Sequence, residues 1–326
     1  DEFHRHLDRV RPDAVHLLGC SHSGVMNYDS GVGPGTEDEA QLRQRIAAAR
    51  ERDIKVLAQH SGVGNKAAGD AHPEWIRTCS DGTRATQKRA GWQMDLLSPY
   101  PEEWFLPQVE EMLRDYDADG LWVDGDCWYM YPSYSEAWVQ RFEEETGLEP
   151  PRISEDGWRF LAPTASGTAR EETEDAPGPE EVQRLRRWMA FTRKIFREFQ
   201  RKTGELCHRY GAVYASNGTH SVDSGPDPFP GYMDYLSHDI PAMESSGCFM
   251  ASMKARFNGT QGPPHDVMVW DSNSHNPWGG VQAYPKGRKQ FFAEVGSALA
   301  NGAIWNNWTR RPHDGMAWEV SDFIRK

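Results

Sequence analysis

The stretch DGLWVDGDCW at residues 119–128 decides the fold of this chain. Leu121, Trp122 and Val123 form a short apolar run of the kind found in a buried parallel strand. Asp124 ends that run, and Gly125 after it lets the backbone turn tightly while the carboxylate stays at the strand tip. Catalytic groups of α/β barrels sit at such strand tips, although an Asp at this position can equally cap the next helix.

Six further short apolar segments alternate with helical stretches along the chain, which is the pattern of repeated βα units. The seven predicted strands are 14–19, 55–60, 119–124, 212–217, 234–239, 267–271 and 302–307. The predicted helices are 38–52, 102–116, 134–146, 179–203, 248–257 and 286–301. We therefore predict an α/β fold, a (β/α)8 TIM-type barrel, with an open doubly wound sheet as the structural alternative.

Seven strands are one fewer than such a barrel usually has, and the chain opens with the helix-like segment EFHRHLDRV. We expect the barrel to lack its first strand in this chain, so that 119–124 is strand four. Residues 1–326 are expected to form a single barrel domain. Within it, 148–180 is rich in Pro, Gly, Ser and acidic residues, which predicts an insertion or flexible loop.

The composition indicates which binding partners and which cellular compartment to expect. The chain carries 36 basic and 49 acidic residues, a net charge of −13, without a basic run that could follow a phosphate backbone, so nucleic acid is not expected as a partner. No apolar run reaches the roughly 18 residues of a membrane span, and the first residues do not form a secretory signal. The five scattered cysteines favour a reducing compartment, which indicates a cytoplasmic protein.

Polar or ionisable residues stand at the end of every predicted strand. In chain order they are Cys20-Ser21-His22, Gln59-His60, Asp124-Gly125-Asp126, Ser216-Asn217, His238-Asp239, Trp270-Asp271 and Asn306-Asn307. Because the carboxyl ends of barrel strands meet on one face, we expect these residues to converge there. The 13 Trp of the chain would suit the flat faces of sugar rings in such a site, as well as a large core.

Cleavage of a glycosidic bond with retention needs two carboxyls roughly 5 to 5.5 Å apart, one of them an ionised nucleophile and the other a neutral acid. Asp124 is the predicted nucleophile. Glu244 is the predicted acid, because Pro241 and Met243 beside it provide an apolar setting that raises the pKa of a carboxyl. Asp239 and Asp271 are the alternatives for the acid.

Two other classes of function stay open at this level. Six histidines near predicted strand ends could gather a metal, but none of these six stands in an HxH or HExxH spacing, so we expect no metal and no cofactor. They are His22, His60, His220, His238, His265 and His275. A sugar-binding barrel without activity would keep an aromatic pocket and place no second carboxyl near Asp124. Serine hydrolysis is not indicated, because the chain has no GxSxG segment.

Several longer segments resemble the barrel domain of α-L-fucosidase-like glycoside hydrolases, including a group of hypothetical bacterial glycosyl hydrolases often followed by a trimerisation domain. The resemblance extends from Phe3 to about Trp308. It is carried by LGCSHSG at 18–24, HPEW at 72–75, SPYPEEWFLPQVEE at 98–111, DYDADGLWVDGD at 115–126 and GSALANGAIWNNW at 296–308.

The resemblance implies that Trp122-Val123-Asp124-Gly125 corresponds to the family's Trp-Phe-Asp-Gly nucleophile segment and that His22 binds a sugar hydroxyl. Ser21 replaces a second His of many relatives and Val123 replaces Phe, so the sugar is left open among α-L-fucoside, α-L-arabinofuranoside, α-L-rhamnoside and β-galactoside.

We expect an exo-acting retaining glycosidase for an oligosaccharide or glycoside substrate, with room for a homo-oligomer. The predicted substrate-binding residues are His22, His60, Trp92, Asp126, Trp128, Asn217, His238, Asp239, Trp270, Asp271 and Trp305.

Overall fold

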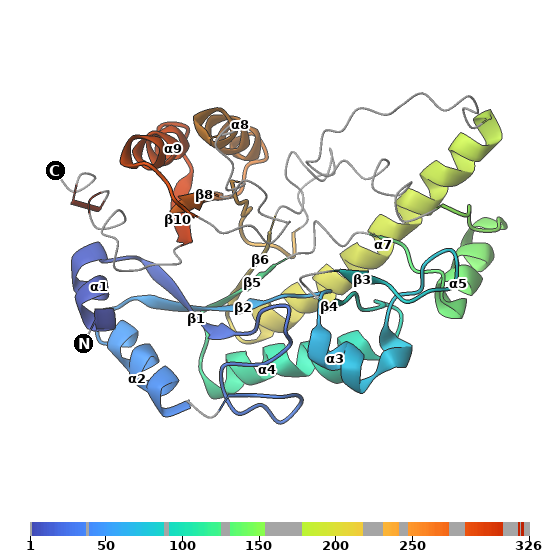
Figure 1. The fold of residues 1–326 in the computed structure, drawn as a ribbon, viewed down its shortest axis with the longest axis horizontal. Helices are drawn as coiled ribbons and strands as arrows, with labels where there is room; N and C mark the ends of the chain where they lie inside the picture. The colour runs from blue at the N-terminus through green and yellow to red at the C-terminus, as the bar shows by residue number, and fades with distance from the viewer. Residues whose placement is uncertain are drawn as a thin grey trace.

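The computed structural model describes residues 2–36, 39–87, 91–124, 131–153, 178–217, 231–240, 247–273, 284–308, 319 and 321–322. Parallel strands and helices alternate along the chain (Figure 1). The main strands are β1 (Ala14–Gly19), β2 (Lys55–His60), β5 (Gly120–Val123), β6 (Val213–Ser216), β7 (Asp266–Trp270) and β10 (Ile304–Trp308). Four two-residue strands, β3 (Thr86–Gln87), β4 (Gly91–Trp92), β8 (Ser272–Asn273) and β9 (Tyr284–Pro285), form two small antiparallel pairs.

The helices lie on the outside of the parallel strands, with α8 and α9 on one side of them and α2 and α4 on the other (Figure 1). Their bounds are α1 (Glu2–Val10), α2 (Glu39–Arg50), α3 (Lys66–Ala71), α4 (Leu106–Asp115), α5 (Glu136–Thr146), α7 (Pro179–Arg209), α8 (Gly247–Gly259) and α9 (Arg288–Ala300). Two further turns of helix are η1 (Pro73–Trp75) and η2 (Pro101–Phe105).

The parallel strands follow one another in chain order. One sheet has the order β1-β2-β5-β6, and β7 pairs in parallel with β10. The segment 236–239 connects the two sheets, because Ser237 forms a parallel bridge with Asn217 and Asp239 forms one with Met268. Among the described strands the order does not reverse, as it does at the switch point of a doubly wound sheet.

These pairings confirm the predicted mixed α/β fold with a parallel sheet. Six predicted strands match observed ones with ends shifted by at most two residues, and the seventh, 234–239, is present as bridges rather than a continuous strand. The described residues show no pairing between β1 and β10, so closure into a (β/α)8 barrel stays a prediction, as does the single-domain organisation. Most of the predicted insertion, 154–177, lies outside the described residues.

Side chains along the strands alternate between two faces. On β5, Leu121 and Val123 belong to the large core cluster that packs against the helices, and we name this the helix face. Trp122 packs instead with Ala215 and Met268 in a separate cluster, and we name this the interior face. Because paired residues of neighbouring parallel strands point the same way, the observed register extends both faces across the series.

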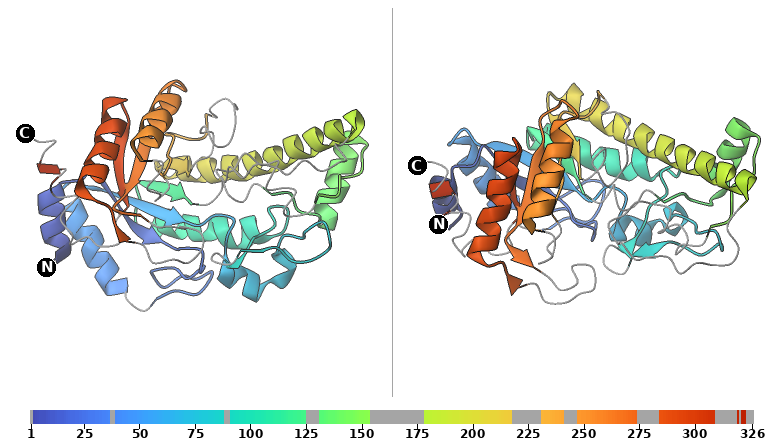
Figure 2. Two further views of the ribbon diagram at one scale, coloured as in Figure 1. Left: turned by 45° about the horizontal axis from the view of Figure 1, so that its top comes forward. Right: turned by 90° about the horizontal axis from the view of Figure 1, so that it is seen from above.

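The long helix α7 extends beyond the strands, where α5 lies beside its N-terminal half (Figure 2). Aromatic rings join the two helices, with Phe142 packed edge-on against Trp188 at 4.7 Å between ring centroids. Arg141 of α5 adds an ion pair to Glu198 of α7 at 2.6 Å. None of the described helices is both long and apolar enough to cross a membrane.

The end of β1 requires glycine. Gly19 has φ +123°, and a Cβ placed there would lie 1.7 Å from the carbonyl oxygen of Gln59 on β2. The close approach lets the amide of Cys20 donate to that same carbonyl at 3.0 Å, which extends the β1–β2 pairing into the following turn. Gly19 therefore sets the direction in which the chain leaves β1.

Replacing Gly19 by Ala should lower the free energy of unfolding by about 3 kcal/mol or more, because the new Cβ meets main chain and φ is unfavourable. Urea unfolding midpoints measure the effect. The matched control is Gly296→Ala in α9, where a Cβ has nothing within 4 Å and the change should be neutral or stabilising by up to about 1 kcal/mol. A Gly19→Ala variant as stable as the parent protein would contradict this account.

Candidate active site

Asp124 follows β5 directly, on the interior face, and main-chain bonds hold it in place. Its amide donates to the carbonyl of His60 at 2.7 Å, and the amide of Asn217 donates to the carbonyl of Val123 at 2.8 Å. The ladder between β2, β5 and β6 thus continues one residue beyond the strands. Because Val123 pairs with Ser216, Asp124 and Asn217 are direct neighbours on adjacent strands.

Two side chains approach the Asp124 carboxylate. Asn217 Nδ2 donates to Oδ1 at 3.1 Å, and Nε2 of His22 lies 3.9 Å from Oδ2. The side chains of His22 and Asp124 are 26% and 27% exposed, whereas Asn217 is only 2% exposed. The Asp124 carboxylate is therefore held by the buried Asn217 amide and remains accessible from solvent. The structure thus brings together three of the predicted site residues.

His22 lies in a turn that is hydrogen-bonded to the N-terminal end of α3. The amides of Lys66 and Ala67, in the first turn of this helix, donate to the carbonyls of His22 and Ser23 at 3.0 and 3.1 Å. These helix-start amides have no partner within the helix, and the turn provides one. Gly24 closes the turn because a Cβ there would lie 2.1 Å from Oδ1 of Asn65.

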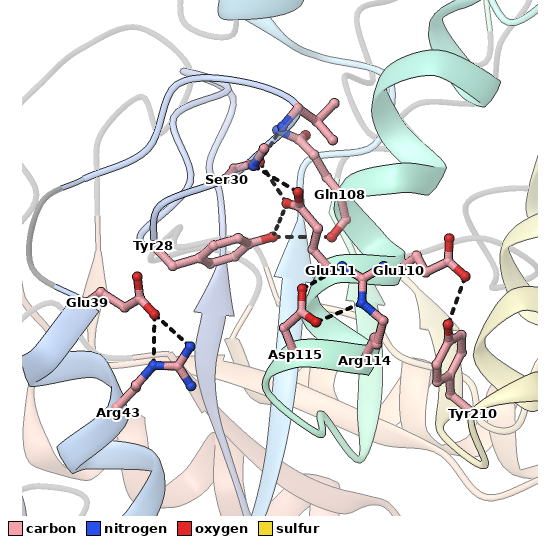
Figure 3. A network of polar contacts seen from close by, with 12 residues as sticks. Tyr28, Ser30, Glu39, Arg43, Gln108, Glu110, Glu111, Arg114, Asp115 and Tyr210 are labelled. Atoms are coloured by element: carbon pink, nitrogen blue, oxygen red, sulfur yellow. Dashed lines mark hydrogen bonds and ion pairs between the residues drawn. The ribbon is translucent and has the colours of Figure 1, made fainter.

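The remainder of this loop, which connects β1 to α2, is anchored on α4 (Figure 3). Ser30 Oγ donates to Oε2 of Glu111 at 2.7 Å, and the amide of Gly31 donates to Oε1 at 2.9 Å. The Tyr28 hydroxyl donates to the carbonyl of Gln108 at 3.2 Å. The loop that carries His22 is thus held at both ends, by α3 near the site and by α4 farther away.

His60 is not a sugar contact, and that prediction is wrong. Its ring is fully buried on the helix face, edge-on to Phe105 at 4.7 Å. The amide of Gly62 donates to Nδ1 at 3.1 Å, so Nε2 carries the proton and donates to Oε1 of Gln108 at 3.1 Å. Burial lowers the pKa of His60 to about 4, which keeps the ring neutral.

His238 and Trp305 also point to the helix face, so the prediction that they line a sugar pocket is wrong. His238 is 1% exposed and contacts Lys254 of α8 through Nε2. Trp305 packs edge-on against Phe291 of α9, with ring centroids 6.3 Å apart. Side chains alternate along a strand, so only one of two consecutive residues at a strand end can face inward.

Four other predicted residues have described positions. Trp270 packs against the interior cluster of Trp122, and Asp239, bridged to Met268, shares that face. Asp271 is buried after the end of β7, where its carbonyl accepts from the amide of Lys286 at 2.9 Å. Trp92 is half-buried and donates through Nε1 to Asp70 at 2.7 Å. Glu244, Asp126 and Trp128 lie outside the described residues.

Sequence reasoning missed a polar group below the strand tips. Trp122 Nε1 donates to Ser237 Oγ at 2.8 Å, and Ser237 Oγ donates to Asp266 Oδ1 at 2.6 Å. Asn306 Nδ2 donates to Asp266 Oδ2 at 3.1 Å. The local sequence does not mark this group, since Ser237 lies in the polar segment DYLSHD and Asp266 is the first residue of β7, so the residues meet only when distant strands pair. Within the described part of the chain, no group of three His, Cys, Asp or Glu side chains is arranged to hold a metal ion.

Comparison with known proteins gives one family match. Residues 1–125 match the model of the family described as Hypothetical glycosyl hydrolase 6, so the matched part ends just after Asp124. No curated protein sequence gives a significant match to the chain.

Solved structures of glycosidases share the fold. α-L-Fucosidase isoenzyme 2 from Paenibacillus thiaminolyticus has a TM-score of 0.66 and 19% identity, over 98% of this chain and 44% of its own. The β-galactosidase of the psychrophilic Marinomonas ef1 gives 0.66 and 13%, over 99% of this chain and 57% of its own. The β-galactosidase of the Antarctic haloarchaeon Halorubrum lacusprofundi gives 0.66 and 13%, over 98% and 55%.

The chain therefore spans about half the length of these enzymes, and at such identities the likeness concerns the fold. The family match and the shared fold together confirm the predicted resemblance to glycoside hydrolases: the first 125 residues match the model of the Hypothetical glycosyl hydrolase 6 family, and the chain has a fold similar to that of solved glycosidases.

Proposed function

We propose that this chain is the catalytic barrel of an exo-acting glycoside hydrolase that works with retention, with Asp124 as its nucleophile. The observation that carries the proposal is the placement of Asp124 at the tip of β5, held by Asn217 at 3.1 Å and approached by His22 at 3.9 Å. The family match over residues 1–125 and the fold shared with an α-L-fucosidase and two β-galactosidases support glycosidase activity. A closed (β/α)8 arrangement, with one more strand between β10 and β1, is part of the proposal.

The contacts of Asp124 suit a nucleophile. A hydrogen bond donated to the ionised carboxylate favours that form and fixes its direction, and both are needed for attack on an anomeric carbon. With Oδ1 held by Asn217, Oδ2 on the His22 side is the oxygen that would form the bond to the sugar. Water would then release the sugar from the covalent intermediate.

Asn217 offers a contact for the sugar itself. Its Oδ1 is buried and has no hydrogen-bond partner among the described residues, while its Nδ2 is used by Asp124. A buried acceptor left without a donor costs about 1–3 kcal/mol, which a hydroxyl of the bound sugar would recover. A hydroxyl next to the anomeric carbon fits, because contacts there strengthen in the transition state of such reactions. His22 and Trp270 would complete the glycone pocket.

The second carboxyl is proposed to be Glu244, with Asp239 as the competing candidate. Asp239 shares the interior face with Asp124, and Asn217 stands on the strand between them. Asn217 is level with Asp124 and bridges Ser237, so Asp239 lies two strand spacings across and two residues further along, at about 12 Å between backbones. Two Asp side chains that lean toward each other shorten this distance toward the range of a catalytic pair. The sugar is proposed to be α-L-fucose or one of the other three sugars that the sequence leaves open.

Asp124→Gly should lower turnover of the best nitrophenyl glycoside by several orders of magnitude, because the covalent step is lost. The panel to screen contains α-L-fucoside, α-L-arabinofuranoside, α-L-rhamnoside and β-D-galactoside. Azide should restore part of the rate in the variant by attacking in place of the carboxylate. Asp115→Asn, an exposed carboxylate at the end of α4, is the matched control and should keep the parent rate. Full activity in Asp124→Gly would remove Asp124 from the role.

Glu244→Gln and Asp239→Asn separate the two candidates for the acid. Loss of the acid slows release of a poor leaving group far more than release of dinitrophenolate, which needs no proton. We therefore expect one variant to lose kcat/KM on nitrophenyl glycosides by about 10²-fold or more while retaining most activity on dinitrophenyl glycosides. Equal losses on both substrates in both variants would exclude the pair. Proton NMR of the first-formed anomer tests retention directly.

A further inference from the structure

The interior face carries a continuous chain of hydrogen bonds that the proposed reaction does not use. The indole of Trp122 donates to Ser237 at 2.8 Å, and Ser237 donates to Asp266 at 2.6 Å. The three residues are 3%, 1% and 6% exposed and come from three different strand segments. A buried carboxylate is costly unless its acceptor capacity is used, and this one also accepts from Asn306 at 3.1 Å.

Ala215 explains how the indole reaches its partner. Trp122 pairs with Ala215 on β6, and Ser237 lies on the segment beyond β6. Trp122 and Ala215 pack together in one cluster. Because the side chain of Ala215 is only a methyl group, the indole of Trp122 can pass over β6 and reach Ser237. A larger residue at 215 would occupy that path.

The same indole lies next to Asp124 and to the Asn217 amide that holds it. Asp124 follows Trp122 by two residues, and Asn217 follows Ala215 by two residues. Side chains two residues apart share a face, so Asp124 and Asn217 lie on the interior face, nearer to the strand tips than Trp122 and Ala215. On its other side, the ring of Trp122 meets His16 of β1 edge-on at 5.9 Å. The indole thus forms the floor beneath the carboxylate and the amide that holds it.

We infer that Asp266 is a positioning residue, which acts through Ser237 on the Trp122 indole. By fixing this floor, it keeps Asp124 and Asn217 at the separation that the nucleophile requires. The inference rests on the proposed function. Its physical basis is that a hydrogen-bonded chain of buried groups has one low-energy arrangement, whereas packing alone lets an indole pivot about its side-chain bonds.

Protonation of Asp266 should be visible in the activity. Burial raises the pKa of its carboxyl to about 6, even though the hydrogen bonds from Ser237 and Asn306 lower it. As pH falls through 6 the Asp266 carboxylate takes up a proton. The hydrogen bond that it accepts from Ser237 then weakens, and kcat should fall. The Asn side chain of Asp266→Asn is neutral at every pH, so this variant should not show the fall in kcat near pH 6.

Other titratable groups share the interior face in the described part of the chain. Asp124, Asp239 and His22 stand at the strand tips, above the hydrogen-bonded residues Trp122, Ser237 and Asp266. Below them, burial and the negative charge of Asp266 raise the pKa of Tyr235, and burial lowers the pKa of His16 to about 4. Neither Tyr235 nor His16 changes charge near pH 6, so the comparison with Asp266→Asn isolates the one carboxyl.

The test combines kinetics with a spectroscopic readout. Ser237→Ala and Asp266→Asn should each lower kcat about 10- to 100-fold with little change in KM, as expected for a misplaced catalytic group. Thr192→Val removes an equally buried hydroxyl from α7 and should leave kcat unchanged. The indole Nε1 proton of Trp122, assigned with Trp122→Phe, should shift with a midpoint near pH 6 in the parent protein and in Thr192→Val. It should not titrate in Asp266→Asn or Ser237→Ala.

The two readouts separate failure of this inference from failure of the proposed function. If the parent protein hydrolyses no glycoside while the indole signal titrates and the titration disappears in both variants, the glycosidase proposal fails and the coupling of Asp266 to Trp122 stands. If the parent protein is active and both folded variants keep its kcat and pH profile, the positioning role is overturned. An indole signal in the parent protein that does not respond to pH overturns it as well.

Discussion

The site depends on the parallel pairing of β5 with its two neighbours. The ladder continues past the strand ends, since the amide of Asp124 reaches the carbonyl of His60 and the amide of Asn217 reaches that of Val123. Backbone hydrogen bonds therefore fix the Cα positions of the nucleophile candidate and of its amide partner. A shift of one residue in this register would turn Asp124 toward the helices and Val123 toward the interior, which the burial of both faces opposes.

Each face of the strand series has its own chemistry. The helix face is an apolar layer in which the polar residues are neutral or paired, as with His60 against Gln108 and Lys286 against Glu294. The interior face carries the hydrogen-bonded residues Trp122, Ser237, Asp266 and Asn306, and the proposed catalytic groups stand above them. This separation lets the protein bury a carboxyl beneath the site without disturbing the main core.

The loops bring the remaining group into place. His22 is separated from Asp124 by about a hundred residues of sequence, yet Nε2 lies 3.9 Å from the carboxylate because α3 binds the turn around it. The same loop is fastened to α4 by Glu111, which also contacts the Tyr28 hydroxyl (Figure 3). Two helices, α3 and α4, thus position His22 at the strand tips.

The sequence by itself determined the alternation of strands and helices, the position of Asp124 at a strand tip and the polar character of the strand ends. These follow from local hydrophobic patterns and from residues next to one another in the chain. Only the tertiary structure decided which strand-end residues face inward. His60, His238 and Trp305 stand beside inward-facing residues but point to the helices, because side-chain direction depends on register with the neighbouring strand. The chain through Ser237 and Asp266 was likewise hidden, since its members meet only when distant strands pair.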